Sequence, residues 1–275
     1  MTRKQVQDGV AREQRSSTDA PVVRVTTLGG FSIRVHGEPL VLGRKAPAKP
    51  LALLKFLAGH GQHAVTDAMV AGALWPDKGR SAQRCLAVTL HRLRRLLGSA
   101  EALIHREQHV AIDSQLLWCD AVACEQLLDL AARCKRDAQR MQLTARALAI
   151  YGGEFLAGEP SEGWIAPVRE RLRVRYVASC AALAEHFAAG ARWDEARLLF
   201  QRGLEADELS ENLCLGLMAC YRAMRRPLAG RDAYQRFARA LAARSGAEPA
   251  PALQALYQQL SHQHPARNAV RTRAA

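Results

Sequence analysis

The residues with the clearest chemical potential lie between Arg80 and Gly98, in the sequence RSAQRCLAVTLHRLRRLLG. Leucines recur there at spacings of four and three, which predicts one apolar face of an amphipathic helix: Leu86, Leu90, Leu93 and Leu97. At about 100° per residue, the opposite face carries a different set: Arg84, Val88, His91, Arg92 and Arg95. A row of guanidinium groups of this kind suits the binding of an anion.

This predicted basic helix has no carboxylates to neutralise it, because no acidic residue occurs between Arg80 and Ala100. Exposed helix faces usually mix their charges, since opposite charges four residues apart stabilise a helix. The pattern therefore favours an anionic partner, with an arginine-rich surface helix as the simpler alternative. Arg94 lies about 80° from the apolar face, where its guanidinium either joins the basic face or makes a structural ion pair.

Motifs of catalysis and cofactor binding are missing from the sequence. No G-x-x-x-x-G-K-[ST], G-x-G-x-x-G, G-x-S-x-G or H-E-x-x-H pattern occurs. The nine histidines are scattered, and the pairs His60/His63 and His262/His264 fall in loop or tail contexts. We therefore expect no enzyme activity, no cofactor and no metal site.

Composition narrows the class of partner and the compartment. The 275 residues suggest about two domains, and a net charge of +13 favours either nucleic acid or an anionic membrane. No apolar run is long enough to cross a bilayer and no secretory signal is recognisable, so we expect no membrane partner and a cytoplasmic protein. Seven cysteines without a C-x-x-C spacing predict reduced core thiols rather than disulfides or a zinc site.

The elements around the basic helix predict a small mixed domain. Strands of an antiparallel sheet are expected at 22–28, 31–35 and 40–42. Two helices follow, one from Pro50 to about Ala58 and one with Thr66 as its N-cap that ends at Trp75. Strands at 103–106 and 110–113 form a β-hairpin after the basic helix. This succession predicts a winged helix-turn-helix domain over residues 21–119, preceded by a disordered segment at 1–20.

The rest of the chain predicts helices almost throughout, at 120–134, 138–151, 162–189, 193–206, 210–224, 228–244 and 250–261. Four pairs of residues recur 34 positions apart, which is the tetratricopeptide period: Leu183 and Leu217, Phe187 and Tyr221, Ala196 and Gly230, and Phe200 and Tyr234. The fold class is therefore mainly α with a small β component. An all-α, tetratricopeptide-like domain is expected over 120–262 and a disordered basic tail over 263–275.

A winged helix-turn-helix gives the basic residues specific roles, because its last helix enters the major groove of DNA. Arg84, Val88 and His91 lie in the half expected nearest the base edges, where arginine pairs with guanine and a methyl group meets thymine. Phosphate contacts are expected from Arg80, Arg92, Arg95, Lys45 and Lys49. Two hairpin residues, Arg106 and His109, are candidates for the backbone or the minor groove.

The segments LGGFSIRVHGEPLVLGRKAPAKPLALLKFLA, ALWPD and CLAVTLHRLRRLLG resemble the OmpR-like winged-helix domain of the antibiotic-regulatory-protein (SARP) family of bacterial transcription regulators. The second half, from YGGEFLAGEPSEGW to RSGAEPAPALQALYQQL, resembles the bacterial transcriptional activator domain that follows it in that family. The resemblance spans about residues 22–261. It implies a recognition helix at Arg80–Leu97, sequence-specific binding to repeated promoter elements, head-to-tail action of two copies, and contact with RNA polymerase.

We therefore expect a DNA-binding transcriptional activator, associated with the nucleoid. The alternatives are a scaffold whose winged helix no longer binds DNA and a ligand-sensing regulator. The winged helix is expected to fold without the helical domain, because it carries its own apolar set: Val25, Phe31, Ile33, Leu54, Leu57, Leu74, Leu86, Leu90, Leu93 and Leu97.

Overall fold

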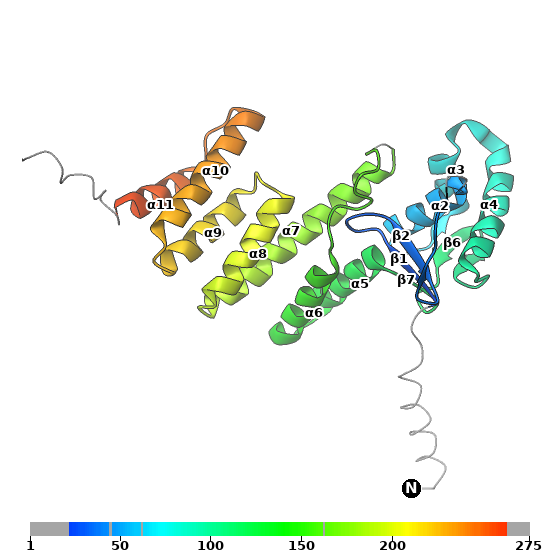
Figure 1. The fold of residues 1–275 in the computed structure, drawn as a ribbon, viewed down its shortest axis with the longest axis horizontal. Coiled ribbons are helices and arrows are strands. Elements are labelled where there is room, and N and C mark those ends of the chain that lie inside the picture. Colours follow the sequence, from blue (N-terminus) through cyan, green and yellow to red (C-terminus); the bar gives the residue numbers. More distant parts are fainter. Residues whose placement is uncertain (1–21, 44–45, 62, 162, 263–275) are drawn as a thin grey trace, which may run out of the picture. The chain divides into compact units, whose positions relative to one another are not determined.

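A computed structural model gives the fold and describes residues 22–43, 46–61, 63–161 and 163–262 (Figure 1). The segments expected to be disordered, 1–20 and 263–275, lie outside the described residues, as do Lys45 and the side chain of Arg80. The chain forms two compact units. The first comprises the described residues up to Gln126 together with Ile150–Val168, and the second comprises Leu127–Ala149 and the described residues from Arg169 onward. The architecture is mainly α with a small β component, as the sequence predicts.

The first unit opens with a four-stranded sheet in the order β3-β2-β1-β7. Its strands are β1 (Val23–Thr26), β2 (Ser32–Val35), β3 (Glu38–Pro39) and β7 (Leu117–Cys119). The predicted strand at 40–42 is wrong. The chain reverses within His36 and Gly37, both with positive φ, so that Glu38 pairs at once with Val35. The sheet is also not wholly antiparallel, because β7 pairs parallel with β1.

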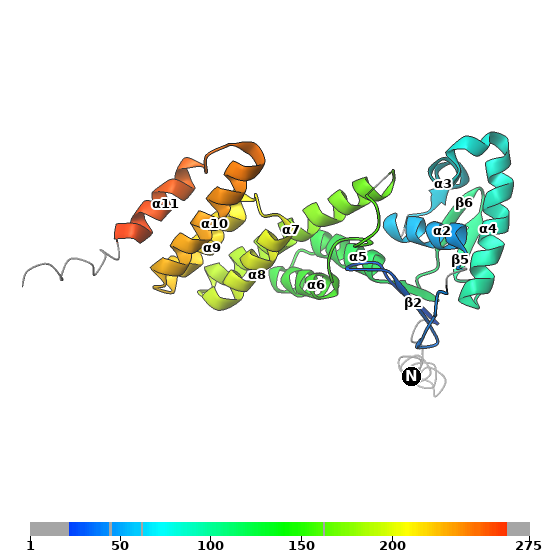
Figure 2. The same cartoon turned by 45° about the horizontal axis from the view of Figure 1, so that its top comes forward.

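Helices α2 (Ala48–Gly59), α3 (Asp67–Leu74) and α4 (Ala82–Leu97) form the helical part of this unit. They group together with the hairpin strands beside α4 (Figures 1 and 2). The Thr66 hydroxyl accepts a hydrogen bond from the Met69 N–H at 3.2 Å, which confirms the predicted cap. Pro76–Ser81 forms a 3₁₀ turn, η2, where a loop was expected, so α4 begins at Ala82. Gly98 ends α4 with φ 64°.

The hairpin after α4 consists of β5 (Leu103–Arg106) and β6 (His109–Ile112), joined by Glu107 and Gln108. Both turn residues have positive φ, 50° and 58°, which matches the twist that two-residue hairpin turns require. A short strand, β4 (Val65–Thr66), pairs with β6 and extends the hairpin to three strands. The four leucines of the predicted apolar face of α4 are at most 2% exposed, and α4 packs against α2 and α3.

Residues beyond 119 complete the core of this unit. Phe155 and Leu156 are fully buried, and Phe155 forms a β-bridge with Leu28. The Leu156 N–H donates to the Thr27 carbonyl at 2.7 Å, and the Gly29 N–H donates to the carbonyl of Glu154 at 2.9 Å. The apolar set named from the sequence is buried apart from Phe31, which is half-buried, but it is not the whole core. The first unit thus includes residues beyond the predicted boundary at 119, and independent folding of residues 21–119 stays a prediction.

Long helices follow the winged helix, and their bounds lie within three residues of those predicted. They are α5 (Asp120–Arg133), α6 (Asp137–Ile150), α7 (Ile165–Ala189), α8 (Trp193–Ala206), α9 (Glu211–Ala223), α10 (Pro227–Ser245) and α11 (Pro251–His262). Within the second unit, α9 packs against α8, α10 and α11. Each helix in the described part of the chain is too short or too polar to cross a membrane.

The 34-residue repeat is confirmed by matching backbone geometry. The turn after α7 has Ala191 at φ 56°, and the turn after α9 has Arg225 at φ 56°. The N–H of Arg192 donates to the Phe187 carbonyl at 2.9 Å, and the N–H of Arg226 repeats this bond to the Tyr221 carbonyl at 2.8 Å. Two helical pairs, α7/α8 and α9/α10, are therefore successive copies of one tetratricopeptide-like unit.

Candidate nucleic-acid interface

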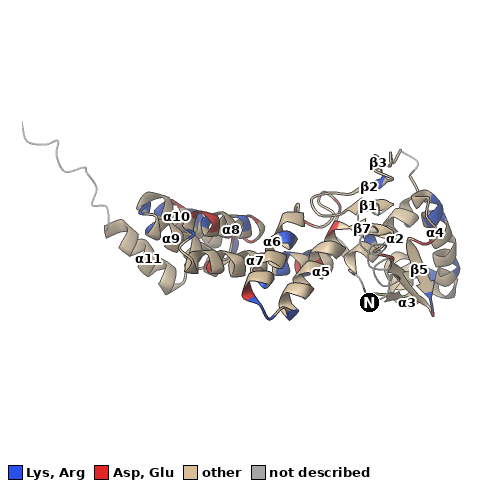
Figure 3. Cartoon of the chain, turned by 90° about the horizontal axis from the view of Figure 1, so that it is seen from below, with Lys and Arg blue, Asp and Glu red and all other residues tan. Residues whose placement is uncertain are grey.

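The exposed face of α4 brings together the five residues predicted for it. Arg84, His91, Arg92 and Arg95 are exposed, and Val88 is 46% exposed. Figure 3 shows the Lys and Arg positions of α4 without an acidic position on the same helix. The buried leucines on the opposite side fix the rotation of the helix, because they pack against α2 and α3.

The arginines of this face have no ion-pair partner among the described residues. Arg84, Arg92 and Arg95 take part in none of the ion pairs found there. Arginines of the helical unit behave differently: Arg173 pairs with Glu170 at 2.8 Å and Arg192 pairs with Glu195 at 2.9 Å. The positive charge of α4 is therefore uncompensated by neighbouring side chains, which suits a surface that meets phosphates.

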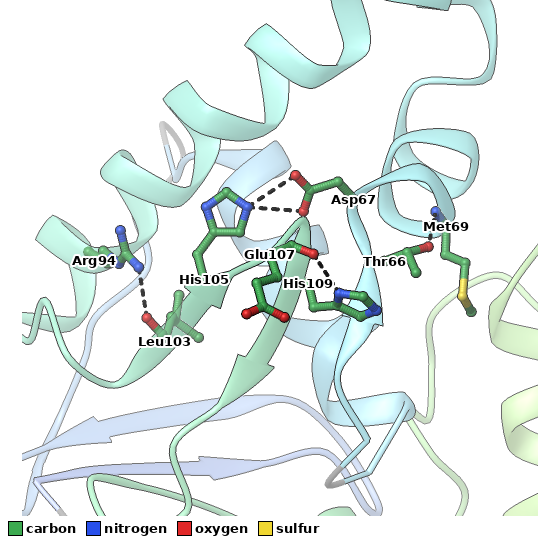
Figure 4. A network of polar contacts seen from close by, with 8 residues as sticks. All are labelled: Thr66, Asp67, Met69, Arg94, Leu103, His105, Glu107 and His109. Atoms are coloured by element: carbon green, nitrogen blue, oxygen red, sulfur yellow. Dashed lines mark hydrogen bonds and ion pairs between the residues drawn. The ribbon is translucent and has the colours of Figure 1, made fainter.

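Arg94 has a structural role, which settles the alternative that the sequence left open. Its terminal nitrogen donates a hydrogen bond to the carbonyl of Leu103 at 2.8 Å (Figure 4). The acceptor is a backbone carbonyl rather than the carboxylate of an ion pair. This bond ties the last turns of α4 to β5, so it helps to set the angle between the helix and the hairpin.

A second contact holds the hairpin against the start of α3. The Nε2 atom of His105 lies 3.0 Å from a carboxylate oxygen of Asp67 (Figure 4). The Asp67 N–H also donates to the Gln108 carbonyl at 2.8 Å. This pair could not be predicted from the sequence, because its members lie 38 positions apart and neither belongs to a local motif. Asp67 and His105 therefore position the hairpin rather than offering free groups to a ligand.

The hairpin candidates Arg106 and His109 lie on either side of the two-residue turn. They pair with each other in the strand register, and both side chains are exposed. The Nδ1 atom of His109 lies 2.8 Å from the carbonyl of Glu107. An exposed carboxylate, that of Glu107, therefore lies between the two basic residues in the sequence and reduces the local positive charge.

Lys49 differs from the residues of the α4 face, because its ammonium already has partners within the protein. The Nζ atom donates to the Leu74 carbonyl at 2.6 Å and lies 5.7 Å from the centre of the Trp75 ring. Lys49 thus joins the start of α2 to the end of α3. Its contact with phosphate stays a prediction, as do the contacts predicted for Lys45 and Arg80.

Two further residues of α4, Gln83 and Ala87, are exposed beside Arg84 and Val88. Neither residue is among the predicted positions, because those lie opposite the leucines on the helix. The width of the exposed face would have indicated them, since a helix that buries one stripe leaves more than half of its circumference free.

The seven cysteines are free thiols. Burial raises the pKa of Cys119 and Cys214 to about 12, and that of Cys180 and Cys220 to about 11. No group of three metal-ligating side chains occurs within the described ranges. The helical unit contains a cavity of about 340 Å³ between α8, α9 and α10, lined in part by Gln201, Glu205, Leu217, Arg236 and Phe237.

Comparison with known proteins identifies one matching family and a solved structure of similar fold. The family model of the bacterial transcriptional activator domain matches residues 119–261, just over half of the chain. No curated protein matches. Among solved structures, the fold is similar to that of Mycobacterium tuberculosis EmbR, determined in complex with a low-affinity phosphopeptide. The TM-score is 0.64 at 22% identity, over 90% of this chain and 67% of that chain.

Proposed function

We propose that this chain, which belongs to the bacterial transcriptional activator domain family, is a SARP-type regulator that binds specific DNA sequences through α4 of its N-terminal winged helix. One observation carries the proposal: the exposed arginines of α4 lack both acidic neighbours in sequence and ion-pair partners in the described structure. In a winged helix-turn-helix this helix occupies the major groove.

The residues of the α4 face divide by their position along the helix. Arg84, Val88 and His91 lie in the half nearer the N-terminus, where they contact base edges. Arg92 and Arg95 lie further along and bind phosphates, as do Arg80, Lys45 and Lys49 before the helix. The hairpin residues Arg106 and His109 contact the adjacent backbone or minor groove.

The helical unit serves protein contacts in this proposal. Tetratricopeptide-like repeats build extended surfaces for partners, and the family association with transcriptional activation favours RNA polymerase and a second copy of the chain as those partners. Two copies bound to direct repeats gain affinity through effective concentration, because each winged helix alone covers a short half-site. The protein is then an activator that works on the nucleoid.

Two other functions fit less of what is observed. A scaffold whose winged helix binds only protein has no need of an unpaired, acid-free arginine face. A ligand-sensing regulator gains one observation, the cavity between α8 and α10, whose volume of about 340 Å³ is at the lower end for small-molecule sites. Such a role would accompany DNA binding rather than replace it.

Selection of bound sites from a random DNA pool tests the proposal directly. We expect the full chain to recover a sequence motif, and the triple variant Arg84→Ala/Arg92→Ala/Arg95→Ala to recover none. A matched control removes the same charge from the helical unit, through Arg140→Ala/Arg192→Ala/Arg244→Ala; Arg192 and Arg244 are exposed and Arg140 is partly exposed. Failure of the unmodified chain to select a motif would exclude sequence-specific binding.

The tandem arrangement needs a separate test. Half-sites on one face of DNA lie about 10–10.5 bp apart, so binding of the full chain should be cooperative at that spacing. An insertion of about half a turn should abolish cooperativity, because it rotates the second site to the opposite face. Cooperative binding that is unaffected by the insertion would contradict the head-to-tail arrangement.

A further inference from the structure

We propose that α4 reads DNA with a second row of residues, in which Gln83 recognises an adenine and Ala87 allows the helix to approach the bases closely. The inference rests on the proposed function and extends it to the base composition of the half-site. Gln83 and Ala87 lie one turn apart, each about 100° around the helix from Arg84 and Val88, and all four side chains are exposed. The surface offered by the first two turns of α4 is therefore two residues wide.

The position of Gln83 is not explained by a role in helix capping. Ser81 is the N-cap of α4 and makes no side-chain cap hydrogen bond, so Gln83 is the second helical residue. The reciprocal capping arrangement needs Glu or Gln at the third helical position, which Arg84 occupies. The amide of Gln83 also has no hydrogen-bond partner among the described residues. Its donor and its acceptor are both available to a ligand.

The chemistry of a primary amide selects adenine among the four bases. Its carbonyl oxygen accepts from the N6 amino group and its NH₂ donates to N7, which is the pairing that glutamine and asparagine make in the major groove. Guanine offers two acceptors at the same edge and suits the guanidinium of Arg84 instead. Neighbouring residues on the first turn therefore read neighbouring purines.

The second turn of α4 exposes two short apolar side chains, Ala87 and Val88, between polar residues on the first and third turns. Val88 is 46% exposed, so packing in the core does not explain a valine at this position. Helix propensity does not explain it either, because valine favours helices less than straight-chain residues do. Short side chains bring the helix backbone close to the groove floor, where the valine methyl groups meet a thymine methyl. A longer side chain at Ala87 would prevent that approach.

Chemically altered DNA tests these assignments, with the motif selected by the full chain as the starting duplex. Each adenine is replaced in turn by 7-deaza-adenine, which lacks the N7 acceptor, and binding of the full chain and of Gln83→Ala is compared. At one adenine we expect the replacement to weaken the unmodified protein roughly 5- to 150-fold and to leave Gln83→Ala nearly unchanged. Deoxyuridine lacks the methyl group of thymine, so replacing one thymine by it should weaken binding of the unmodified protein. The same replacement should leave binding of Val88→Ala nearly unchanged.

Two further variants complete the experiment. Ala87→Leu should lose specific binding while its thermal unfolding stays the same, because the position is exposed. Gln142→Ala, at an exposed position of α6, is the matched control and should respond to 7-deaza-adenine as the unmodified chain does. If a motif is selected but no adenine couples to Gln83, this inference is overturned and the proposed function stands. If no motif is selected, the proposed function itself fails.

Discussion

The carboxylate of Asp120 accepts hydrogen bonds from both the N–H and the hydroxyl of Thr27, at 2.8 and 2.7 Å, across 93 positions of sequence. The Leu28 N–H donates to the same carboxylate at 2.8 Å. Asp120 is 3% exposed, so these donors replace the water that a carboxylate normally requires. The first residue of α5 therefore belongs structurally to the sheet of the first unit.

Asp120→Ala should destabilise this unit. The substitution leaves the buried donors of Thr27 and Leu28 without an acceptor, and each such group costs roughly 1–3 kcal/mol. We expect the free energy of unfolding, measured by urea denaturation, to fall by at least about 2 kcal/mol. Asp113→Ala is the control, because Asp113 accepts from the N–H of Gln115 at an exposed site. Equal effects of the two substitutions would show that the buried bonds contribute no more than a surface turn does.

Arg84→Ala and Arg95→Ala should weaken DNA binding in different ways, because the two residues lie near opposite ends of the exposed face. Loss of a bidentate base contact at Arg84 should cost about 1–3 kcal/mol at one base position, whereas loss of Arg95 should weaken all duplexes alike. Binding to cognate and scrambled duplexes distinguishes the two effects. If Arg84→Ala weakens binding to both duplexes equally, Arg84 contacts phosphate rather than a base.

DNA binding should fall steeply with salt concentration. The phosphate candidates are Arg80, Arg92, Arg95, Lys45, Lys49 and Arg106, and about six contacts give a log–log slope on the order of −5, at about −0.9 for each contact. Arg92→Gln/Arg95→Gln should make the slope shallower by about 1.8. Titration between low and physiological salt measures both slopes. A slope near zero would exclude an interface made by these side chains.

Gly216→Ala should destabilise the helical unit although alanine is the better helix former. A Cβ at Gly216 in α9 would collide with the ring of Phe200, which is 4% exposed. The control is Gly72→Ala in α3, where a Cβ meets nothing within 4 Å. This substitution should raise the free energy of unfolding by up to about 1 kcal/mol. Thermal unfolding of the two variants should therefore shift in opposite directions.

Thiol reactivity should divide the cysteines by burial. Burial raises the pKa of Cys119, Cys180, Cys214 and Cys220 to about 11 or 12, so these side chains stay protonated and unreactive near neutral pH. Mass spectrometry after brief alkylation at pH 7 should find adducts first at the partly exposed Cys85 and Cys134. Reaction of the buried four should require alkaline pH approaching those values, or unfolding. Early modification of Cys180 would show that α7 opens locally.

Local signals in the sequence were sufficient for most helices. Thr66 and Gly98 mark helix ends through their own chemistry, a hydroxyl that accepts from a free N–H and a glycine at positive φ. The spacing of the leucines likewise predicted the buried face of α4. The basic face followed from the same geometry, so the structure gathers residues that the sequence already singled out.

Contacts between distant segments had no such signal. The parallel pairing of β7 with β1, the burial of Phe155 and the bond from Lys49 to the Leu74 carbonyl all depend on tertiary packing. The hydrogen bond from Arg94 to Leu103 shows the same limit at short range, because a guanidinium donates equally well to a phosphate or to a carbonyl. Periodicity reports which face of a helix is buried, but not which polar groups are already satisfied.

The matched turns at Ala191 and Arg225 also determine how this protein can change length during evolution. Each turn joins its helices through the same backbone bonds, and such repeats make most of their contacts with immediate neighbours. Duplication or loss of one 34-residue period would keep the backbone bonds of these turns in register. The helical unit can therefore lengthen or shorten by whole repeats, while the core of the first unit depends on individual residues beyond its hairpin, among them Phe155 and Asp120.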